Sequence, residues 1–302
     1  MSRARRGKPV HGVVLLDKPE GLSSNQALQK VRRLFEARKA GHTGSLDPFA
    51  TGMLPICLGE ASKTAGYMLD ADKAYRATMK LGQATETGDT EGAVVEEQPV
   101  PPHSDAEIAQ ALNAFRGEID QVPPMYSALK HQGQPLYKLA RAGKTVERAP
   151  RRVAIREISL VERTPDTLTF EVQCSKGTYI RTLAEDIGRA LDTCAHLVAL
   201  RRLWVQPFED ATMVTLDQLR NAAEEASLSS WLLPLDAGLQ SWPVCELDAE
   251  AARRFAHGNP VDTGRAVRGW HRVTGPDGQP IGLGEGDSTR RIAPRRVYHF
   301  ES

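Results

Sequence analysis

The chain has 302 residues, of which 40% are hydrophobic and 25% are charged, and its formal net charge is +1. This composition is typical of a globular protein with a full core, and the length favours two domains over one. It excludes a membrane-spanning protein, because no apolar run approaches the roughly 20 residues that a helix needs to cross a bilayer.

The N-terminus and the cysteines indicate a cytoplasmic protein. The apolar stretch behind the N-terminal basic residues covers only residues 13–16, which is too short for the core of a signal peptide. The four cysteines have no Cys-x-x-Cys spacing. We therefore expect them to be reduced and buried.

Basic residues are clustered along the chain although the net charge is small. They gather at residues 3–8, 32–39, 141–156, 201–202 and 290–296, whereas acidic residues gather at 86–97 and 217–248. A protein with charges separated in this way can present one positive face to nucleic-acid phosphates. The alternative for each cluster is an ordinary solvated surface, which we prefer for Arg32 and Arg33.

The first part of the chain predicts a mixture of strands and capped helices. The expected elements are a strand at 12–17, a helix opened by the capping pair Ser23 and Gln26 and ending before Gly41, a helix at 60–69, a strand with one exposed face at 75–81, a loop or hairpin at 85–97, and a helix opened by Ser104 and Glu107.

Residues 121–150 break this pattern with a Pro-Pro pair, several glycines, and basic residues mixed with tyrosines. Such a mixture suits a mobile flap that contacts RNA, and a plain surface excursion is the alternative. The elements expected after it are paired strands at 153–161 and 168–174, a helix at 178–191, a helix at 248–257, and short strand-like pieces up to 302. Helices and strands that do not alternate regularly predict an α+β fold with a largely antiparallel sheet.

The segment at residues 41–55 contains three glycines and two prolines, which should forbid a regular helix or a central strand. Its apolar residues nevertheless need burial, so we expect a constrained loop packed across a rigid scaffold. Asp47 is the only carboxylate between Glu36 and Glu60, and Pro48 biases it toward an extended backbone. The alternative is that Asp47 only caps a turn.

This segment resembles the catalytic motif of the TruB-type tRNA pseudouridine synthases. Similar motifs follow the family order elsewhere: LDKPEG at 16–21, KAYR at 73–76, CSKGTYIR at 174–181, and the stretch from Ala195-His196 to Leu200-Arg201-Arg202-Leu203. The resemblance implies a pseudouridine synthase fold, a largely antiparallel mixed sheet flanked by helices, at 1–244, with an RNA-gripping insertion at about 121–150. It also implies a small PUA-like RNA-binding β-barrel at 245–302, an assignment that depends mainly on position.

The resemblance further implies the conversion of uridine 55, in the TΨC loop of tRNA, to pseudouridine. This reaction breaks the N1–C1′ bond, turns the uracil and rejoins it through C5, so we expect no cofactor and no metal. Asp47 would be the nucleophile, or the group that assists cleavage of the glycosidic bond. Arg181 would be its charged partner and would oppose the rise in pKa that an apolar pocket causes.

The family match also assigns four substrate-binding residues. Tyr75 would stack on the flipped uridine and assist proton removal from C5, Tyr179 and Leu200 would line the uracil pocket, and His42 would fill the gap left by the flipped nucleotide. Flipping costs a few kcal/mol, and stacking on an aromatic ring returns roughly 1–3 kcal/mol. Core packing is the alternative for Tyr75, Tyr179 and Leu200, and an exposed helix surface is the alternative for Arg181.

Two other classes of function remain open at this level. A glycosidase-like hydrolase normally needs two carboxylates that flank the bond, and the central segment offers only Asp47. A non-catalytic tRNA-binding or tRNA-folding protein would need only the C-terminal module, but it gives no reason for a constrained aspartate. We expect a monomer that binds the T-arm of tRNA.

Overall fold

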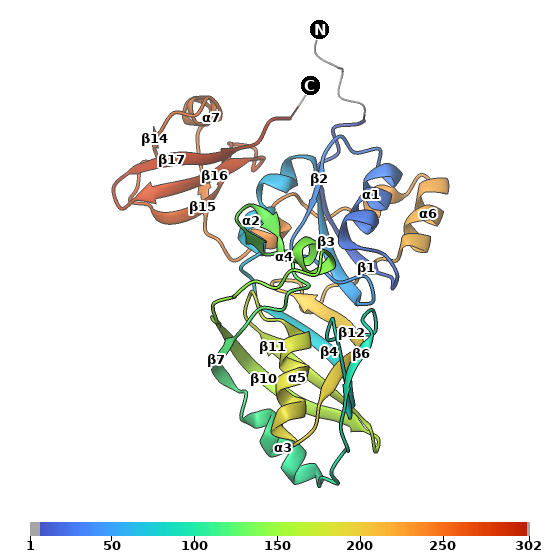
Figure 1. The fold of residues 1–302 in the computed structure, drawn as a ribbon. Helices are drawn as coiled ribbons and strands as arrows, with labels where there is room; N and C mark the ends of the chain where they lie inside the picture. The colour runs from blue at the N-terminus through green and yellow to red at the C-terminus, as the bar shows by residue number, and fades with distance from the viewer. Residues whose placement is uncertain (1–6, 301–302) are drawn as a thin grey trace.

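The computed structural model describes residues 7–300, so Arg3, Arg5 and Arg6 of the first basic cluster lie outside the described part. The fold is built on an eight-stranded sheet and a separate five-stranded sheet (Figure 1). The large sheet contains β1 (Gly12–Lys18), β2 (Ala40–His42), β3 (Thr51–Leu58), β4 (Lys73–Leu81), β7 (Gly117–Gln121), β10 (Arg151–Arg163), β11 (Thr167–Cys174) and β12 (Ala195–Val205).

The order of the large sheet is β1-β3-β12-β4-β11-β10-β7, and β2 pairs with β3 beside this path. Only β3 and β12 run parallel, and the other neighbours are antiparallel. This confirms the predicted α+β class with a largely antiparallel mixed sheet. The strand β12, which no periodicity predicted, lies at the centre of the sheet and joins its two halves.

Helices cover the sheet in separate groups (Figure 1). Helices α3 (Asp105–Asn113) and α5 (Ile180–Ala190) share one apolar cluster with β4, β10, β11 and β12. Helices α1 (Ser24–Leu34) and α6 (Leu216–Glu224) pack on β1 and β3. The predicted capping boxes open α1 and α3, and α6 has a third one, between Thr215 and Gln218, that the sequence analysis missed.

Two predictions about the first part of the chain are wrong. Residues 51–55 of the proline-containing segment belong to a central strand, β3. On the side of β3 away from β1, β12 pairs with Thr51 and Gly52 and β2 pairs with Ile56, Cys57 and Leu58, so Pro55 has no ladder partner there that needs its missing N–H. Its carbonyl accepts a hydrogen bond of 3.2 Å from the Thr43 N–H. The helix expected at 60–69 is divided into a 3-10 turn, η1 (Gly59–Lys63), and a short α2 (Ala65–Met68), with Thr64 between them.

The segment between β7 and β10 is an excursion between two strands that pair with each other, as an insertion should be. It contains the hairpin β8 (Lys130–His131) and β9 (Gln134–Pro135), followed by α4 (Leu136–Arg141). The polar stretch after β4 forms the second small hairpin, β5 (Gln83–Thr85) and β6 (Val94–Glu97), as predicted.

The C-terminal part forms the expected small β module. Its sheet contains β13 (Val244–Glu246), β14 (Val261–Asp262), β15 (Arg268–Thr274), β16 (Pro280–Asp287) and β17 (Arg291–Val297), and α7 (Ala249–Ala256) packs into the same core. Two short 3-10 turns, η2 (Leu228–Trp231) and η3 (Ala237–Leu239), precede it.

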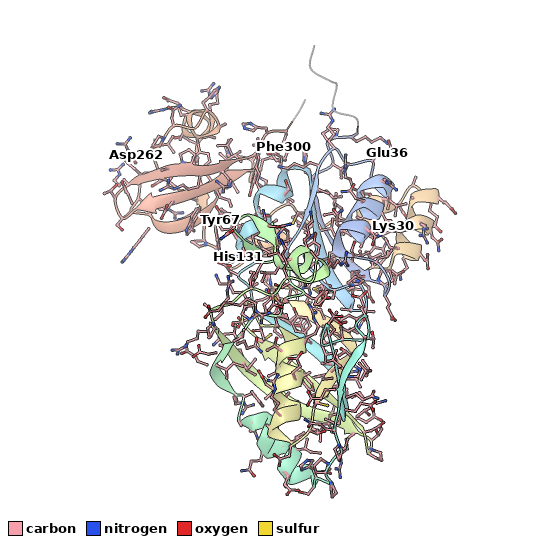
Figure 2. All side chains as sticks on the ribbon, viewed as in Figure 1. Lys30, Glu36, Tyr67, His131, Asp262 and Phe300 are labelled. Carbon is pink, nitrogen blue, oxygen red and sulfur yellow. The ribbon has the colours of Figure 1, made fainter. Side chains whose placement is uncertain are left out.

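The C-terminal module contacts the rest of the chain at η1 and α2. Tyr67 of α2, labelled in Figure 2, lies beside the C-terminal module. Its ring contacts the rings of Trp242 and Trp270 at centroid distances of 5.1 and 5.2 Å. Lys63 Nζ donates a hydrogen bond of 2.6 Å to the carbonyl of Val297. All four cysteines are free and buried, as predicted. No helix within residues 7–300 is long and apolar enough to cross a bilayer.

Candidate active site

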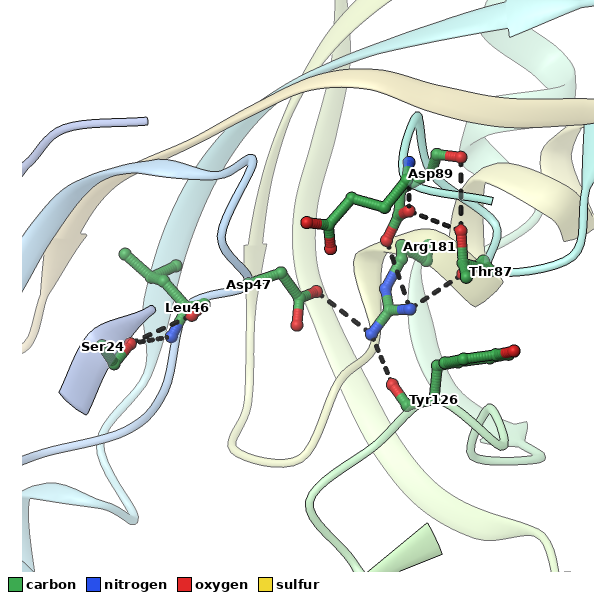
Figure 3. Close-up of polar contacts among 8 residues, drawn as sticks. Ser24, Leu46, Asp47, Thr87, Asp89, Tyr126 and Arg181 are labelled. Carbon is green, nitrogen blue, oxygen red and sulfur yellow. Dashed lines mark hydrogen bonds and ion pairs between the residues drawn. The ribbon is translucent and has the colours of Figure 1, made fainter. Parts of the chain in front are cut away.

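The loop between β2 and β3 holds Asp47 in a fixed position. On one side, Ser24 in the first turn of α1 bonds both backbone groups of Leu46: its Oγ accepts from the Leu46 N–H at 2.7 Å and donates to the Leu46 carbonyl at 3.0 Å (Figure 3). Leu46 and Phe49, which flank Asp47, are buried in the core that contains α5. The part of the predicted segment that lies between β2 and β3 is therefore a constrained, apolar loop, whereas residues 51–55 belong to β3.

Lys18 supports the other side of this loop. It is completely buried at the end of β1, and its Nζ donates to the carbonyls of Pro19, Leu22 and Pro48 at 2.9, 2.6 and 3.2 Å. Burial lowers the pKa of Lys18 to about 8, although the negative charge of Asp47 opposes this change. Lys18 fixes the backbone directly after Asp47.

Arg181 lies in the first turn of α5 and is 5% exposed. Its guanidinium bridges four acceptors: Nη2 is 3.1 Å from Asp47 Oδ2 and donates to the Tyr126 carbonyl at 2.8 Å, while Nη1 is 3.3 Å from Asp89 Oδ2 and donates to the Thr87 carbonyl at 2.8 Å (Figure 3). The exposed helix-surface alternative for Arg181 is therefore wrong, and the pairing of Arg181 with Asp47 is found in the structure.

Asp89 is a site residue that the sequence analysis missed. It lies in the β5–β6 hairpin, which the sequence identified only as polar and glycine-rich, and its side chain is 2% exposed. Its Oδ1 accepts from Thr87 Oγ1 at 2.5 Å and from the Glu91 N–H at 3.0 Å. Only the fold shows that this carboxylate is buried against Arg181.

The charges around Asp47 act on its ionisation in opposite directions. Burial raises the pKa of Asp47 above its usual value, Arg181 lowers it, and Asp89 adds a smaller upward effect. The side chain of Asp47 is still 39% exposed, whereas that of Arg181 is 6% exposed. A ligand can therefore reach the carboxylate, while the guanidinium that stabilises its charge is shielded from water.

Tyr75 and Leu200 lie on adjacent central strands of the sheet, β4 and β12. Both are buried, 8% and 7% exposed, in the cluster that also contains Leu46 and Ile180. Burial raises the pKa of the Tyr75 hydroxyl, and the guanidinium of Arg202 opposes this rise. A tyrosine of this kind is rarely ionised at neutral pH, so it suits stacking better than removal of a proton.

Tyr179 is the residue that precedes α5. Its backbone exchanges two hydrogen bonds with the side chain of Gln121, whose Oε1 accepts at 3.0 Å and whose Nε2 donates at 3.3 Å. The side chain is half-buried, and burial raises the pKa of its hydroxyl. Tyr179 is thus held in place directly before Ile180, a residue of the buried cluster, and two residues before Arg181 in the sequence.

His42 ends β2 and is not brought into contact with Asp47 by any hydrogen bond or ion pair within residues 7–300. Its Nδ1 is buried without a hydrogen-bond partner, and burial, together with the charge of Arg202, lowers the pKa of His42. The lowered pKa favours the neutral imidazole, and the unpartnered Nδ1 is available to a ligand.

Arg202 is a second buried arginine that sequence reasoning did not assign. It is 1% exposed, and it donates to the carbonyls of Met53 at 2.7 Å and Gly44 at 3.1 Å, so it ties both ends of the active-site loop to β12. Gly52 makes the close approach of β3 to β12 possible: its φ is +98°, and a Cβ there would lie 2.2 Å from the Arg202 carbonyl oxygen.

Within residues 7–300 no group of three or more His, Cys, Asp or Glu side chains is arranged to hold a metal ion. The groups that meet at the site are a reachable carboxylate, a buried guanidinium, and an apolar wall with a tyrosine. This set can bind and act on a planar, uncharged ring with an attached sugar.

Comparisons with known proteins agree with this chemistry. Three family models match consecutive parts of the chain: the N-terminal domain of the TruB family pseudouridylate synthases at residues 32–180, the tRNA pseudouridylate synthase B C-terminal domain at 181–240, and the C-terminal domain of pseudouridine synthase II TruB at 243–298.

Full-length relatives and solved structures are also similar to the chain. A tRNA pseudouridine synthase B of Chromohalobacter salexigens is 52% identical over 100% of this chain and 99% of that protein, and one of Pseudomonas aeruginosa is 51% identical over 98% of both. A crystal structure of a Cbf5-Nop10-Gar1 complex has a TM-score of 0.73 at 25% identity, over 95% of this chain and 85% of that one. These matches show that the chain belongs to the TruB family and is a pseudouridine synthase, as the sequence motifs implied.

Proposed function

We propose that this chain converts uridine 55 in the T-arm of tRNA to pseudouridine, with Asp47 as the reacting carboxylate. The observation that carries the proposal is the pair formed by Asp47 and Arg181, in which the carboxylate is reachable and the guanidinium is buried. The tRNA specificity of relatives that are about half identical supports the substrate, since each is named a tRNA pseudouridine synthase B.

The reaction needs a negative charge next to the sugar or base of a nucleotide that has left its stack. Asp47 supplies this charge, either as the nucleophile or as the group that assists cleavage of the N1–C1′ bond. The freed uracil then turns, a new bond forms between C5 and C1′, and the C5 proton is lost while N1 gains one. The charge of Arg181 favours the ionised form of Asp47, because it opposes the effect of burial on the pKa.

The buried wall beside the pair would hold the uracil through this rotation. Tyr75 would stack on the ring, and Tyr179 and Leu200 would limit the space in which the ring turns. An aromatic stack of this kind is worth roughly 1–3 kcal/mol, which offsets most of the cost of extruding one base. His42 would occupy the position that the extruded nucleotide leaves.

We propose the same division of the RNA-binding surfaces as the sequence led us to expect. Residues 1–244 would form the catalytic domain, residues 121–150 would grip the RNA, and residues 245–302 would contact it as a PUA-like module. The protein would act as a monomer.

Hydrolysis of a glycosidic bond is the rival reaction, because the fold brings Asp89 close to the site as a second carboxylate. Its side chain is 2% exposed and is engaged by Arg181, Thr87 and the backbone of Glu91. A hydrolase would need this carboxylate to activate a water or protonate a leaving group. Asp89 is too enclosed for either role, so the site favours rearrangement over hydrolysis.

The direct test is incubation of the protein with an unmodified tRNA transcript, followed by chemical labelling that maps pseudouridine along the RNA. We expect one modified position, at uridine 55, and none in a transcript that carries cytidine there. Modification at other positions only would refute the substrate assignment. Release of free uracil without pseudouridine would show a hydrolase instead.

A further inference from the structure

The insertion at 121–150 and the β5–β6 hairpin are joined by a side-chain hydrogen bond beside the active site. The hydroxyl of Tyr126, in the insertion, donates to Glu86 Oε1, in the hairpin, at 2.7 Å. The two residues are 40 positions apart in sequence, and no element of the large sheet joins them directly. This exposed bond therefore joins the two segments directly, in addition to any link through the sheet or through Arg181.

Both segments also bind the guanidinium of Arg181. The backbone carbonyl of Tyr126 accepts from Nη2, and the carbonyl of Thr87, the residue after Glu86, accepts from Nη1, each at 2.8 Å (Figure 3). Tyr126 thus carries one acceptor of the guanidinium, and Glu86 directly precedes Thr87, which carries another. The Tyr126–Glu86 bond links these two positions. A change in the spacing of the two segments must change the position of at least one acceptor.

We propose that Tyr126 and Glu86 are positioning residues for the reaction: their hydrogen bond holds the insertion and the hairpin in the arrangement in which Arg181 faces Asp47. This inference rests on the proposed function of that pair. When the bond is absent, the Tyr126 carbonyl can move away from Nη2. The guanidinium then keeps its contacts with Thr87 and Asp89 in the hairpin and follows the hairpin rather than the insertion. Asp47 then loses part of the positive charge that opposes its protonation.

The position of the insertion is in this way coupled to the ionisation of the reacting carboxylate. The titratable groups that act on Asp47, or on which it acts, come from several elements: Arg181 and Tyr179 at α5, Asp89 and Glu91 in the hairpin, Lys18 on β1 and Tyr75 on β4. Among these, Arg181 is bonded both to the insertion, through the Tyr126 carbonyl, and to the hairpin, through the Thr87 carbonyl. We therefore expect its effect on Asp47 to respond most strongly to the Tyr126–Glu86 bond.

The test compares variants that break the bond with variants that keep it. Tyr126→Phe removes the donor and Glu86→Ala removes the acceptor, whereas Glu86→Gln retains a side-chain oxygen that can accept. Tyr67→Phe is the matched control, because it removes a tyrosine hydroxyl on α2 that has no hydrogen bond within residues 7–300. The pKa of Asp47 is measured in the free full-length protein by carbon-13 NMR of the labelled carboxyl group, without RNA.

We expect Tyr126→Phe and Glu86→Ala each to raise the pKa of Asp47 by about 0.5 to 1, equivalent to one ordinary hydrogen bond. The double variant should rise no further than either single variant, because both remove the same bond. Glu86→Gln and Tyr67→Phe should match the wild type. If the pKa of Asp47 is unchanged in Tyr126→Phe, or the two single effects add, the positioning role is refuted.

Activity gives the second readout. The single-turnover rate of pseudouridine formation at saturating tRNA should fall about threefold to tenfold in the two bond-breaking variants, with the loss greatest at acidic pH. A loss confined to tRNA affinity, with an unchanged rate at saturation, would show that Tyr126 is an RNA contact and would overturn the proposal. Because the NMR titration needs no substrate, failure of the proposed reaction would leave the coupling measurable and would be recognised separately.

Discussion

Replacement of Arg181 by methionine should destabilise the protein as well as inactivate it. The methionine side chain is close in length but has no charge and no donors. It leaves the Asp89 carboxylate, whose side chain is 2% exposed, without its cationic partner. It also leaves the carbonyls of Thr87 and Tyr126 without the donors at 2.8 Å that now bind them.

The magnitude follows from the burial of the two carboxylates. Removal of one partner of a buried ion pair costs about 3–5 kcal/mol, because the other charge stays buried and uncompensated. This cost belongs to Asp89. The Asp47 side chain is 39% exposed, so water screens its charge and its pairing adds about 1 kcal/mol or less. A domain that is stable by about 5–15 kcal/mol would remain folded in the variant.

The assay is urea unfolding of the wild type, Arg181→Met, Asp89→Asn and the double variant Arg181→Met/Asp89→Asn. The double variant should recover much of the stability that Arg181→Met loses, because it no longer buries an unpaired charge. Neither Arg181→Met nor the double variant should form pseudouridine at a normal rate. The reasoning is refuted if Arg181→Met unfolds at the same urea concentration as the wild type, or if the double variant is less stable than Arg181→Met.

Three further outcomes are expected. Gly52→Ala should lose about 2–3 kcal/mol of stability in thermal unfolding, because φ is +98° and the added Cβ would meet the Arg202 carbonyl; an unchanged melting temperature would contradict this. Burial lowers the pKa of Lys18 from 10.5 to about 8, so the unfolded chain binds more protons between these values. As the pH rises through that range, the free energy of unfolding of the wild type should thus increase by up to about 3 kcal/mol relative to that of Lys18→Met. Free energies of unfolding that change in parallel with pH in the two proteins would argue against this. Removal of residues 244–302 should weaken tRNA binding more than the single-turnover rate and should lower the melting temperature, since it uncovers Tyr67; tRNA affinity equal to that of the full chain would remove the RNA-binding role of the module.

The sequence predicted correctly those helices and strands that are determined by residues close to one another in the chain. The capping boxes at Ser23 and Ser104 open helices because the side chains satisfy backbone groups within three residues. The alternation at 75–81 gives β4, because one face of that strand is buried under α5. In these cases the residues that decide the structure are neighbours in the chain.

The errors arose where tertiary pairing decides the structure. Pro55 argued against a strand at 41–55, but its position opposite a gap in the ladder could be known only from the partners of β3. The apolar spacing of 60–69 suited one helix, yet the packing of η1 and α2 against the C-terminal module divides it at Thr64.

The same distinction applies to the active site. Asp47, Arg181 and Tyr75 are found by motif, because each lies in a segment that resembles the family. Asp89 and Arg202 are more deeply buried than Asp47, but Asp89 is one of several acidic residues in a polar stretch and Arg202 is one of two adjacent arginines. Nothing local distinguishes them, since their importance comes from partners about 90 and 150 residues away in sequence.

The central claim is that the carboxylate of Asp47, held by Arg181, performs the chemistry and contributes little to the binding of RNA. The most direct measurement is the single-turnover rate of pseudouridine formation at position 55 by Asp47→Asn, taken together with its affinity for the same unmodified tRNA. The asparagine has nearly the same shape and lacks only the charge. We predict that the rate falls below detection while the affinity stays within a few-fold of the wild type; normal turnover in this variant would contradict the account.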